Sequence, residues 1–140
     1  MAIKQTFIDT LFIAALINKR DRYHAQADEL ASLYDSQPLL TTDAVLLEIG
    51  NALARAFKPE AGDVIERFLA SDDVQVVRLT PELFGKALVL YRSRSDKEWG
   101  LVDCISFVVM QDAGVTDALT FDHHFVQAGF RALMRDLSTA

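Results

Sequence analysis

The sequence predicts an α/β protein in which short parallel strands form a central sheet covered by helices. Two observations lead to this class. Short apolar runs alternate with amphipathic stretches, and no low-complexity tract, internal repeat or linker interrupts them. The 140 residues are 51% hydrophobic and only 24% charged, which provides enough apolar material for one core. We therefore expect a single domain, residues 1–140, with a three-layer α/β/α (Rossmann-like) architecture and a parallel sheet of four or five strands.

The first half of the chain is expected to run strand, helix, helix, strand, helix, helix. Helices are assigned where apolar residues recur on one face, and Pro59 is well placed to start one of them. The expected strands are 6–8 and 38–41, and the expected helices are 10–18, 22–34, 43–57 and 59–70.

The second half continues the alternation. Thr80 and Pro81 are typical of a helix start, and Gly114 is typical of a helix end. The expected strands are 74–79, 117–121 and 131–134, and the expected helices are 81–92 and 101–113.

Cysteine content and hydropathy limit the class of protein. The single cysteine, Cys104, cannot form an internal disulfide or a thiolate zinc site alone, and its apolar neighbours favour a packed thiol. The apolar stretch 7–17 is interrupted by Asp9 and is too short to span a bilayer. We expect a cytoplasmic protein without a membrane segment.

Four acidic residues lie inside or against strongly apolar stretches, where an isolated carboxylate would be costly to bury. Two of them follow expected strands, and ligands of open parallel sheets bind at the carboxyl ends of the strands. Carboxylate oxygens are the ligands that Mg²⁺ and Mn²⁺ prefer. The sequence therefore suggests a divalent-cation site formed by Asp9, Glu48, Asp103 and Asp122.

Each acid also has a structural interpretation, which stays open at this point. Asp9 and Asp122 could be helix N-caps, and Glu48 could form an ion pair across a helix groove. Asp103 is the hardest to explain structurally, because its helix is apolar on nearly every side. The joint interpretation is stronger than any single one, because four clustered carboxylates without a cation would repel one another.

Several neighbours could support such a site. Glu48, Asn51 and Arg55 would form one stripe along the expected helix 43–57. Thr10 places a hydroxyl beside Asp9, and Thr120 could orient a neighbouring group. We expect His123 and His124 to have a structural role in a turn. We expect His24 to pack or form a hydrogen bond on its helix, and Asp117 to lie at a strand end or turn. The sequence indicates no serine–histidine–aspartate catalytic arrangement.

Four segments, 7–10, 41–53, 99–107 and 118–130, carry a resemblance to a known family, and the last two are the most specific. With them the chain resembles PIN-domain ribonucleases, specifically the VapC-like toxins of toxin–antitoxin pairs, over essentially its whole length. The resemblance implies metal-dependent cleavage of RNA phosphodiester bonds, with Asp9, Glu48 and Asp103 mainly as metal ligands and Asp122 for a second ion. It also implies a homodimer and neutralisation by a small antitoxin protein.

Two features fit the resemblance less well. Many members have a serine two positions after the first aspartate, where this chain has Leu11. The net charge is −6, partly because of the acidic site itself, although basic residues gather at 19–22 and 92–97. Arg55, Arg94 and Lys97 are the candidate contacts to an RNA backbone, and ordinary solvated charge explains them equally well.

Two other functions remain open from the sequence. A Mg²⁺-dependent phosphatase or phosphotransfer domain could place acids on a similar sheet, but it would favour a second aspartate at the position of Leu11. A non-catalytic interaction protein would use the same acids as helix caps and ion-pair partners. RNA cleavage that requires both a divalent metal and Asp103 would separate the nuclease from both alternatives.

Overall fold

The computed structural model describes residues 4–138, and five parallel strands form one sheet in the order β3-β2-β1-β4-β5. The expected α/β class and the parallel sheet are confirmed. The fully buried β1 lies at the centre, as expected for a strand with no polar face. The strands are β1 (Thr6–Ile8), β2 (Leu39–Thr42), β3 (Val74–Val77), β4 (Asp117–Leu119) and β5 (Arg131–Ala132).

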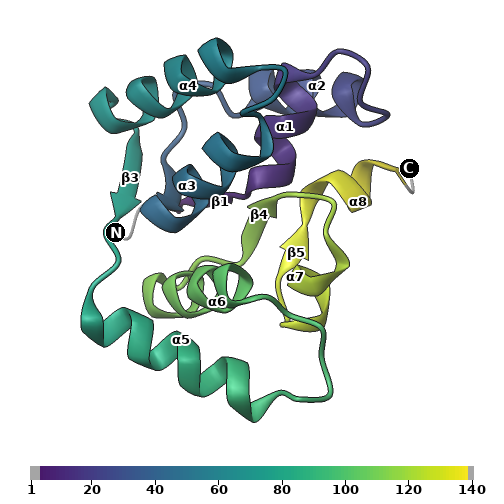
Figure 1. Ribbon diagram of the computed structural model, residues 1–140. Coiled ribbons are helices and arrows are strands. Elements are labelled where there is room, and N and C mark those ends of the chain that lie inside the picture. Colours follow the sequence, from purple (N-terminus) through teal and green to yellow (C-terminus); the bar gives the residue numbers. More distant parts are fainter. Residues whose placement is uncertain (1–3, 139–140) are drawn as a thin grey trace.

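Helices cover both faces of this sheet. In Figure 1, α1, α2 and α4 lie on one side of the strands, and α5 and α6 lie on the other. Crossovers between parallel strands are right-handed. The chain first moves from β1 toward β3 and later from β4 to β5, so the helices of the two directions lie on opposite faces of the sheet. The helices are α1 (Thr10–Ile17), α2 (His24–Leu33), α3 (Asp43–Ala52), α4 (Lys58–Ala70), α5 (Pro81–Ser93), α6 (Leu101–Ala113), α7 (His123–Gln127) and α8 (Leu133–Ser138).

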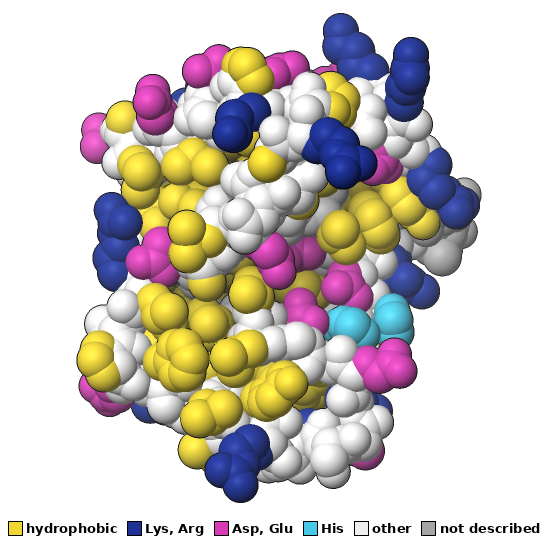
Figure 2. Space-filling model, in the orientation of Figure 1, with side chains coloured by type: hydrophobic (Ala, Val, Ile, Leu, Met, Phe, Trp, Pro, Cys, Tyr) yellow, Lys and Arg dark blue, Asp and Glu magenta, His cyan; other side chains and the backbone are white. Residues whose placement is uncertain are grey.

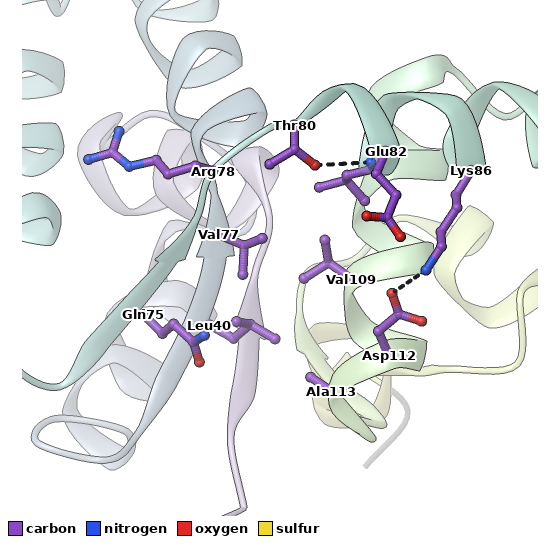
Figure 3. Close-up of a pocket in the computed structure, with 11 residues that line it drawn as sticks. Leu40, Gln75, Val77, Arg78, Thr80, Glu82, Lys86, Val109, Asp112 and Ala113 are labelled. Carbon is purple, nitrogen blue, oxygen red and sulfur yellow. Dashed lines mark hydrogen bonds and ion pairs between the residues drawn. The ribbon is translucent and has the colours of Figure 1, made fainter.

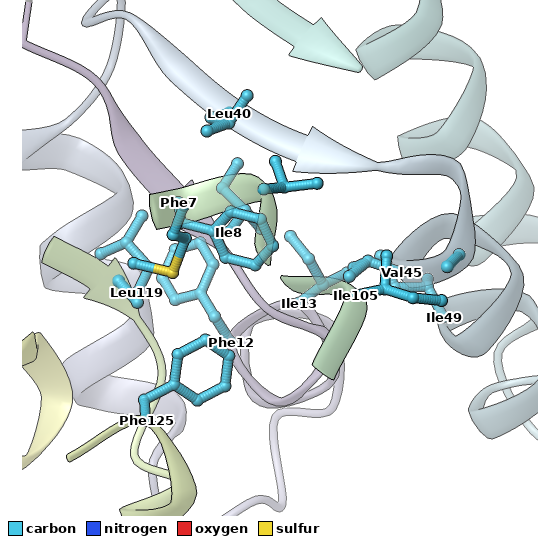
Figure 4. Close-up of a cluster of buried hydrophobic side chains, with 14 of the residues drawn as sticks. Phe7, Ile8, Phe12, Ile13, Leu40, Val45, Ile49, Ile105, Leu119 and Phe125 are labelled. Carbon is cyan, nitrogen blue, oxygen red and sulfur yellow. The ribbon is translucent and has the colours of Figure 1, made fainter. Parts of the chain in front are cut away.

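The core lies between the sheet and the helices. Figure 4 shows Phe7, Leu40 and Leu119 of neighbouring strands together with Val45 of α3 and Phe125 of α7. All five side chains are almost fully buried. Fully burying a large apolar side chain stabilises the fold by roughly 1.5–3 kcal/mol, so these contacts fix the strand ends on which the candidate site depends.

Local capping explains several helix boundaries that the sequence predicts. The hydroxyl of Thr42 and that of Thr80 each accept a hydrogen bond of 3.1 Å from the backbone N–H three residues later in the chain. These bonds cap the starts of α3 and α5. Gly114 ends α6 with φ +68°, a left-handed conformation that glycine adopts without strain.

The expected helix 43–57 is wrong beyond residue 52. α3 ends at Ala52, and Arg55 lies in the turn before α4. Pro59 has no N–H to donate to the carbonyl of Arg55, so one continuous helix through this region would lose a hydrogen bond. Asn51 is still on α3, but Arg55 does not extend the stripe that begins at Glu48.

The end of the chain also differs from expectation. The strand expected at 131–134 stops at Ala132, and Leu133 begins α8. A short apolar run such as 132–134 does not distinguish strand from helix by periodicity. The five-residue helix α7, which follows Asp122 directly, was not predicted as an element.

The strand order creates a topological switch point between β1 and β4. The chain progresses from β1 toward β3 on one side and from β4 to β5 on the other. Ligands of open α/β sheets bind at the carboxyl ends of strands at such a point. Asp9 follows β1 and Thr120 follows β4, so this edge is where a site is expected. No helix among the described residues combines the length and hydropathy needed to cross a bilayer.

Candidate metal centre

Asp9 is the most deeply placed carboxylate of the site. It follows β1 directly and is only 5% exposed. Although it occupies the N-cap position of α1, its side chain makes no capping hydrogen bond. Burial is the largest cause that raises the pKa of Asp9, to about 7. The negative charges of Asp103 and Glu48 act in the same direction, and the hydrogen bond from Thr120 opposes them. Helix capping therefore does not explain why this carboxylate is buried.

Thr120 connects the ends of the two central strands. Its hydroxyl donates to Asp9 Oδ2 at 2.8 Å and accepts from the backbone N–H of Asp122 at 3.0 Å. The Thr120 side chain is completely buried. Thr120 therefore orients the carboxylate of Asp9 and fixes the backbone of Asp122.

Glu48 reaches the site from α3. Its Oε1 accepts a hydrogen bond of 2.6 Å from the hydroxyl of Thr10, the residue after Asp9. Glu48 is half-buried, whereas Asn51 and Arg55 are exposed. The negative charge of Glu48 acts on Asp9, so the two carboxylates belong to one cluster.

Asp103 approaches from the opposite face of the sheet, in the first turn of α6. Its Oδ2 accepts from the backbone N–H of Gly100 at 3.0 Å and lies 3.1 Å from Nδ1 of His124. Burial raises the pKa of Asp103, and the negative charge of Asp122 adds to this effect. The helix dipole stabilises a carboxylate in the first turn only modestly. Burial and the charge of Asp122 outweigh it, so the charged form of Asp103 is disfavoured.

Asp122 begins α7 and faces both neighbouring histidines. Its Oδ1 caps the helix by accepting from the backbone N–H of His124 at 2.9 Å, which confirms the N-cap interpretation for this residue. The same oxygen lies 3.5 Å from Nδ1 of His124 and 3.8 Å from Nδ1 of His123. His124 contacts two of the four acids, whereas the His123 side chain is 58% exposed.

His124 is the residue that sequence reasoning did not assign to the site. The adjacency of Asp122, His123 and His124 was visible, but a sequence does not show which ring turns inward. The short helix α7 decides this, because it aims the ring of His124 at Asp103 and leaves His123 toward solvent. Among the described residues, Asp122, His123 and His124 each place one potential metal-ligand atom within 4.8 Å of the other two.

The four acids therefore form one electrostatic cluster that spans both sides of the switch point. Glu48 and Asp103 act on Asp9, and Asp122 acts on Asp103. Figure 2 shows acidic side chains gathered near the middle of this face, with histidine beside them. Such a set of oxygen donors suits a hard divalent cation, whose charge would offset the repulsion and the desolvation of Asp9.

Two of the basic residues named from the sequence, Arg94 and Lys97, are engaged locally. Arg94 donates from Nε and Nη2 to the two carboxylate oxygens of Asp96, at 3.0 Å each, and its guanidinium lies 5.1 Å from the ring centroid of Trp99. Lys97 Nζ lies 4.0 Å from Asp96. The hydrogen bonds that Arg94 donates to Asp96 raise the pKa of Arg94, so the guanidinium stays charged.

A separate groove of about 410 Å³ lies between β3 and the helices α5 and α6. Figure 3 shows Val77 and Val109 facing each other across it, with an ion pair of 3.6 Å between Lys86 and Asp112 at its rim. None of the four clustered acids lines this groove. In the acidic cluster Asp9 is buried, whereas Glu48, Asp103 and Asp122 are half-buried, so the cluster reaches the surface at the strand ends.

Cys104 plays no part in the cluster chemistry. Its side chain is fully buried in α6, next to Asp103, and burial raises the pKa of its thiol to about 11. The expected packed, unreactive thiol is confirmed.

Comparison with known proteins agrees with this fold. The PIN-domain family model matches residues 6–131. The 23S rRNA-specific endonuclease VapC20, from two strains of Mycobacterium tuberculosis, is 33% identical over 126 residues, which cover 89% of this chain and 94% of VapC20. The crystal structure of M. tuberculosis VapC20, described as a sarcin-ricin loop cleaving toxin, superposes with a TM-score of 0.81 at 31% identity, covering 89% of this chain and 95% of the other. The chain therefore belongs to the PIN-domain family.

Proposed function

We propose that this protein is a metal-dependent endoribonuclease and the toxin of a toxin–antitoxin pair. The observation that carries the proposal is the cluster of Asp9, Glu48, Asp103 and Asp122 at the switch point of the sheet. The similarity to VapC20, an endonuclease that acts on 23S rRNA, supports RNA as the substrate class. A cytoplasmic location, where such RNA is found, is part of the proposal.

The proposed roles follow from the position of each side chain. Asp9, Glu48 and Asp103 would hold Mg²⁺ or Mn²⁺, and Asp122 would contribute to a second position. The bound ion would supply an acidified water and positive charge opposite the scissile phosphate. Thr120 holds Asp9 and Thr10 holds Glu48, so these hydroxyls orient the carboxylates before the substrate arrives.

A basic and aromatic surface beside Asp122 is a proposed place for the RNA to contact the protein. The rings of Tyr23 and Phe121 stack with centroids 3.9 Å apart, and the Arg22 guanidinium lies 5.0 Å from the Tyr23 centroid. Arg135 Nη1 donates to the carbonyl of Phe121 at 3.1 Å. Arginine guanidinium groups bind phosphate, and aromatic rings stack on unpaired bases.

Cleavage assays test the proposal directly. Purified antitoxin-free protein is incubated with structured and single-stranded RNAs in EDTA, Mg²⁺ or Mn²⁺. We expect defined cleavage products only with a divalent metal. Absence of cleavage of every RNA, combined with no metal-induced rise in melting temperature, would favour a non-catalytic interaction protein. Metal binding combined with trapping of an acyl-phosphate analogue would favour the phosphatase alternative.

The proposed antitoxin and homodimer contacts need exposed apolar surface, and α5 carries more of it than other helices do. Phe84, Leu88 and Tyr91 recur on one side of α5 and are 41%, 38% and 46% exposed. The helices α2 and α3 contribute one large exposed apolar side chain each, Leu33 and Leu47. Figure 2 shows apolar side chains gathered over the α5–α6 region.

We expect Leu88→Asp to shift the protein from dimer to monomer without unfolding it, because a charge in an apolar interface is costly when unpaired. Sedimentation velocity measures this change. Val89→Asp is the matched control: the residue is next along the same helix, is 69% exposed, and lies on a different side of it. A wild-type monomer at micromolar concentration, or equal effects of both variants, would contradict this interface.

A further inference from the structure

We propose that His124 is a metal ligand, so that the cation position between Asp103 and Asp122 is bound by nitrogen as well as oxygen and takes Mn²⁺ in preference to Mg²⁺. The inference rests on the metal site of the proposed function and deepens it, because it assigns a residue outside the acidic set and a metal preference.

The first support is the spacing of the donor atoms. Nδ1 of His124 lies 3.1 Å from Asp103 Oδ2 and 3.5 Å from Asp122 Oδ1. Two adjacent ligands of an octahedral ion with bonds near 2.1 Å are separated by about 3.0 Å. Nδ1 of His124 therefore already lies at roughly ligand spacing from one oxygen of each acid.

The second support is that backbone contacts hold these side chains in place. Asp103 Oδ2 accepts from Gly100 N–H, and Asp122 Oδ1 accepts from His124 N–H. The next residue, Phe125, is completely buried and packs edge-on against Phe107 of α6, with ring centroids 5.0 Å apart. α7 is thus anchored to the helix that carries Asp103, and the His124 side chain, 18% exposed, has little freedom to leave.

The metal preference follows from ligand chemistry. Mn²⁺ shares the carboxylate and water ligands of Mg²⁺, but it is also a first-row transition-metal ion that can bind at sites with nitrogen donors, whereas Mg²⁺ is bound mainly by carboxylate oxygens and water. His123 is assigned no ligand role. Its Nδ1 is farther from Asp122 Oδ1, at 3.8 Å, and its side chain is 58% exposed.

Mn²⁺ bound to the full-length protein can report the ligand directly. Pulsed electron paramagnetic resonance detects the coupling of Mn²⁺ to a ligating ¹⁴N nucleus, and titration gives the affinities for Mn²⁺ and Mg²⁺. We expect the nitrogen coupling in the wild type and in His123→Gln. In His124→Gln we expect the coupling to vanish and Mn²⁺ affinity to fall roughly tenfold or more, with a smaller loss for Mg²⁺.

His24→Gln is the matched control, because His24 is the remaining histidine and sits on α2, where its Nδ1 contacts the carbonyl of Ala15 at 2.9 Å. It should keep the nitrogen coupling. Circular dichroism establishes that His124→Gln is folded, and the backbone N–H that Asp122 caps is unchanged by this substitution. If His124→Gln fails to fold, ¹⁵N-histidine labelling of the wild type replaces it, and the coupling must change to that of ¹⁵N.

The outcomes separate this inference from the proposed function. Mn²⁺ that binds without nitrogen coupling, or coupling that survives in folded His124→Gln, overturns the His124 assignment even if RNA is cleaved. Nitrogen coupling that depends on His124 supports the assignment even if no RNA is cleaved, and in that case only the nuclease proposal fails.

Discussion

Asp103→Asn is expected to keep the fold and lose RNA cleavage by about 10³-fold, because it removes a charged ligand from a metal that supplies several kcal/mol of transition-state stabilisation. The amide oxygen of asparagine can still accept the hydrogen bond from Gly100 N–H, so the start of α6 should remain intact. The loss is measured as the initial rate of cleavage of one defined RNA at saturating Mg²⁺, with circular dichroism to establish folding.

Asp117→Asn provides the matched control for this experiment. Asp117 is another buried aspartate, 6% exposed, but it lies at the opposite end of β4 from Thr120. It pairs with Lys4 at 3.4 Å and Arg131 at 3.9 Å. Cleavage by this variant should stay within about threefold of the wild type. Full metal-dependent activity in Asp103→Asn, or equal loss in both variants, would refute the role assigned to Asp103.

The acidic cluster could be anticipated from the sequence because each carboxylate is marked by apolar neighbours. Asp9 follows a strand that is apolar on both faces, and Asp103 lies in a helix run that packs on the same sheet. The family resemblance placed both on one edge, and parallel topology explains why their chain positions, far apart in sequence, converge at a switch point.

The supporting residues were harder to predict, because their roles depend on local turns. Arg55 appeared to continue the stripe of Glu48 only while α3 was assumed to reach residue 57, and the helix ends five residues earlier. His124 could not be distinguished from His123, since the direction of each ring depends on the short helix α7. Arg94 was named as a candidate RNA contact, and its pairing with Asp96 depends on the turn that brings the two side chains together.

Asp9 is expected to make the metal-free protein less stable as the pH rises. Its pKa is about 7 in the folded protein, against 3.8 ordinarily. Below about pH 4 the carboxyl is protonated in both states and carries no penalty. Between about pH 4 and 7 the unfolded chain releases the proton while the folded chain keeps it, so the free energy of unfolding falls. Above pH 7 the accumulated loss is on the order of 4 kcal/mol.

Asp9→Asn should therefore stabilise the metal-free protein at pH 8 and leave it unchanged near pH 4. The difference between variant and wild type isolates Asp9 from other titrating groups. Urea unfolding in EDTA across this range measures it. Thr120→Val, which removes the hydrogen bond that lowers the pKa of Asp9, should move the window to higher pH. Asp117→Asn should instead destabilise slightly, by about 1 kcal/mol or less, because the ion-pair partners of this buried carboxylate, Lys4 and Arg131, are largely exposed.

Added Mg²⁺ should reduce the stability advantage of Asp9→Asn over the wild type at pH 8. A cation that binds only the folded wild type stabilises it by about 2.7 kcal/mol at a concentration one hundred times its Kd. Asp9→Asn lacks a charged ligand and should gain less. A buried carboxylate that destabilises the empty protein and strengthens metal binding is explained by function and not by folding. Equal pH dependence of the two proteins in EDTA would show instead that Asp9 is ionised without penalty, and the cluster would lose its electrostatic argument for a cation.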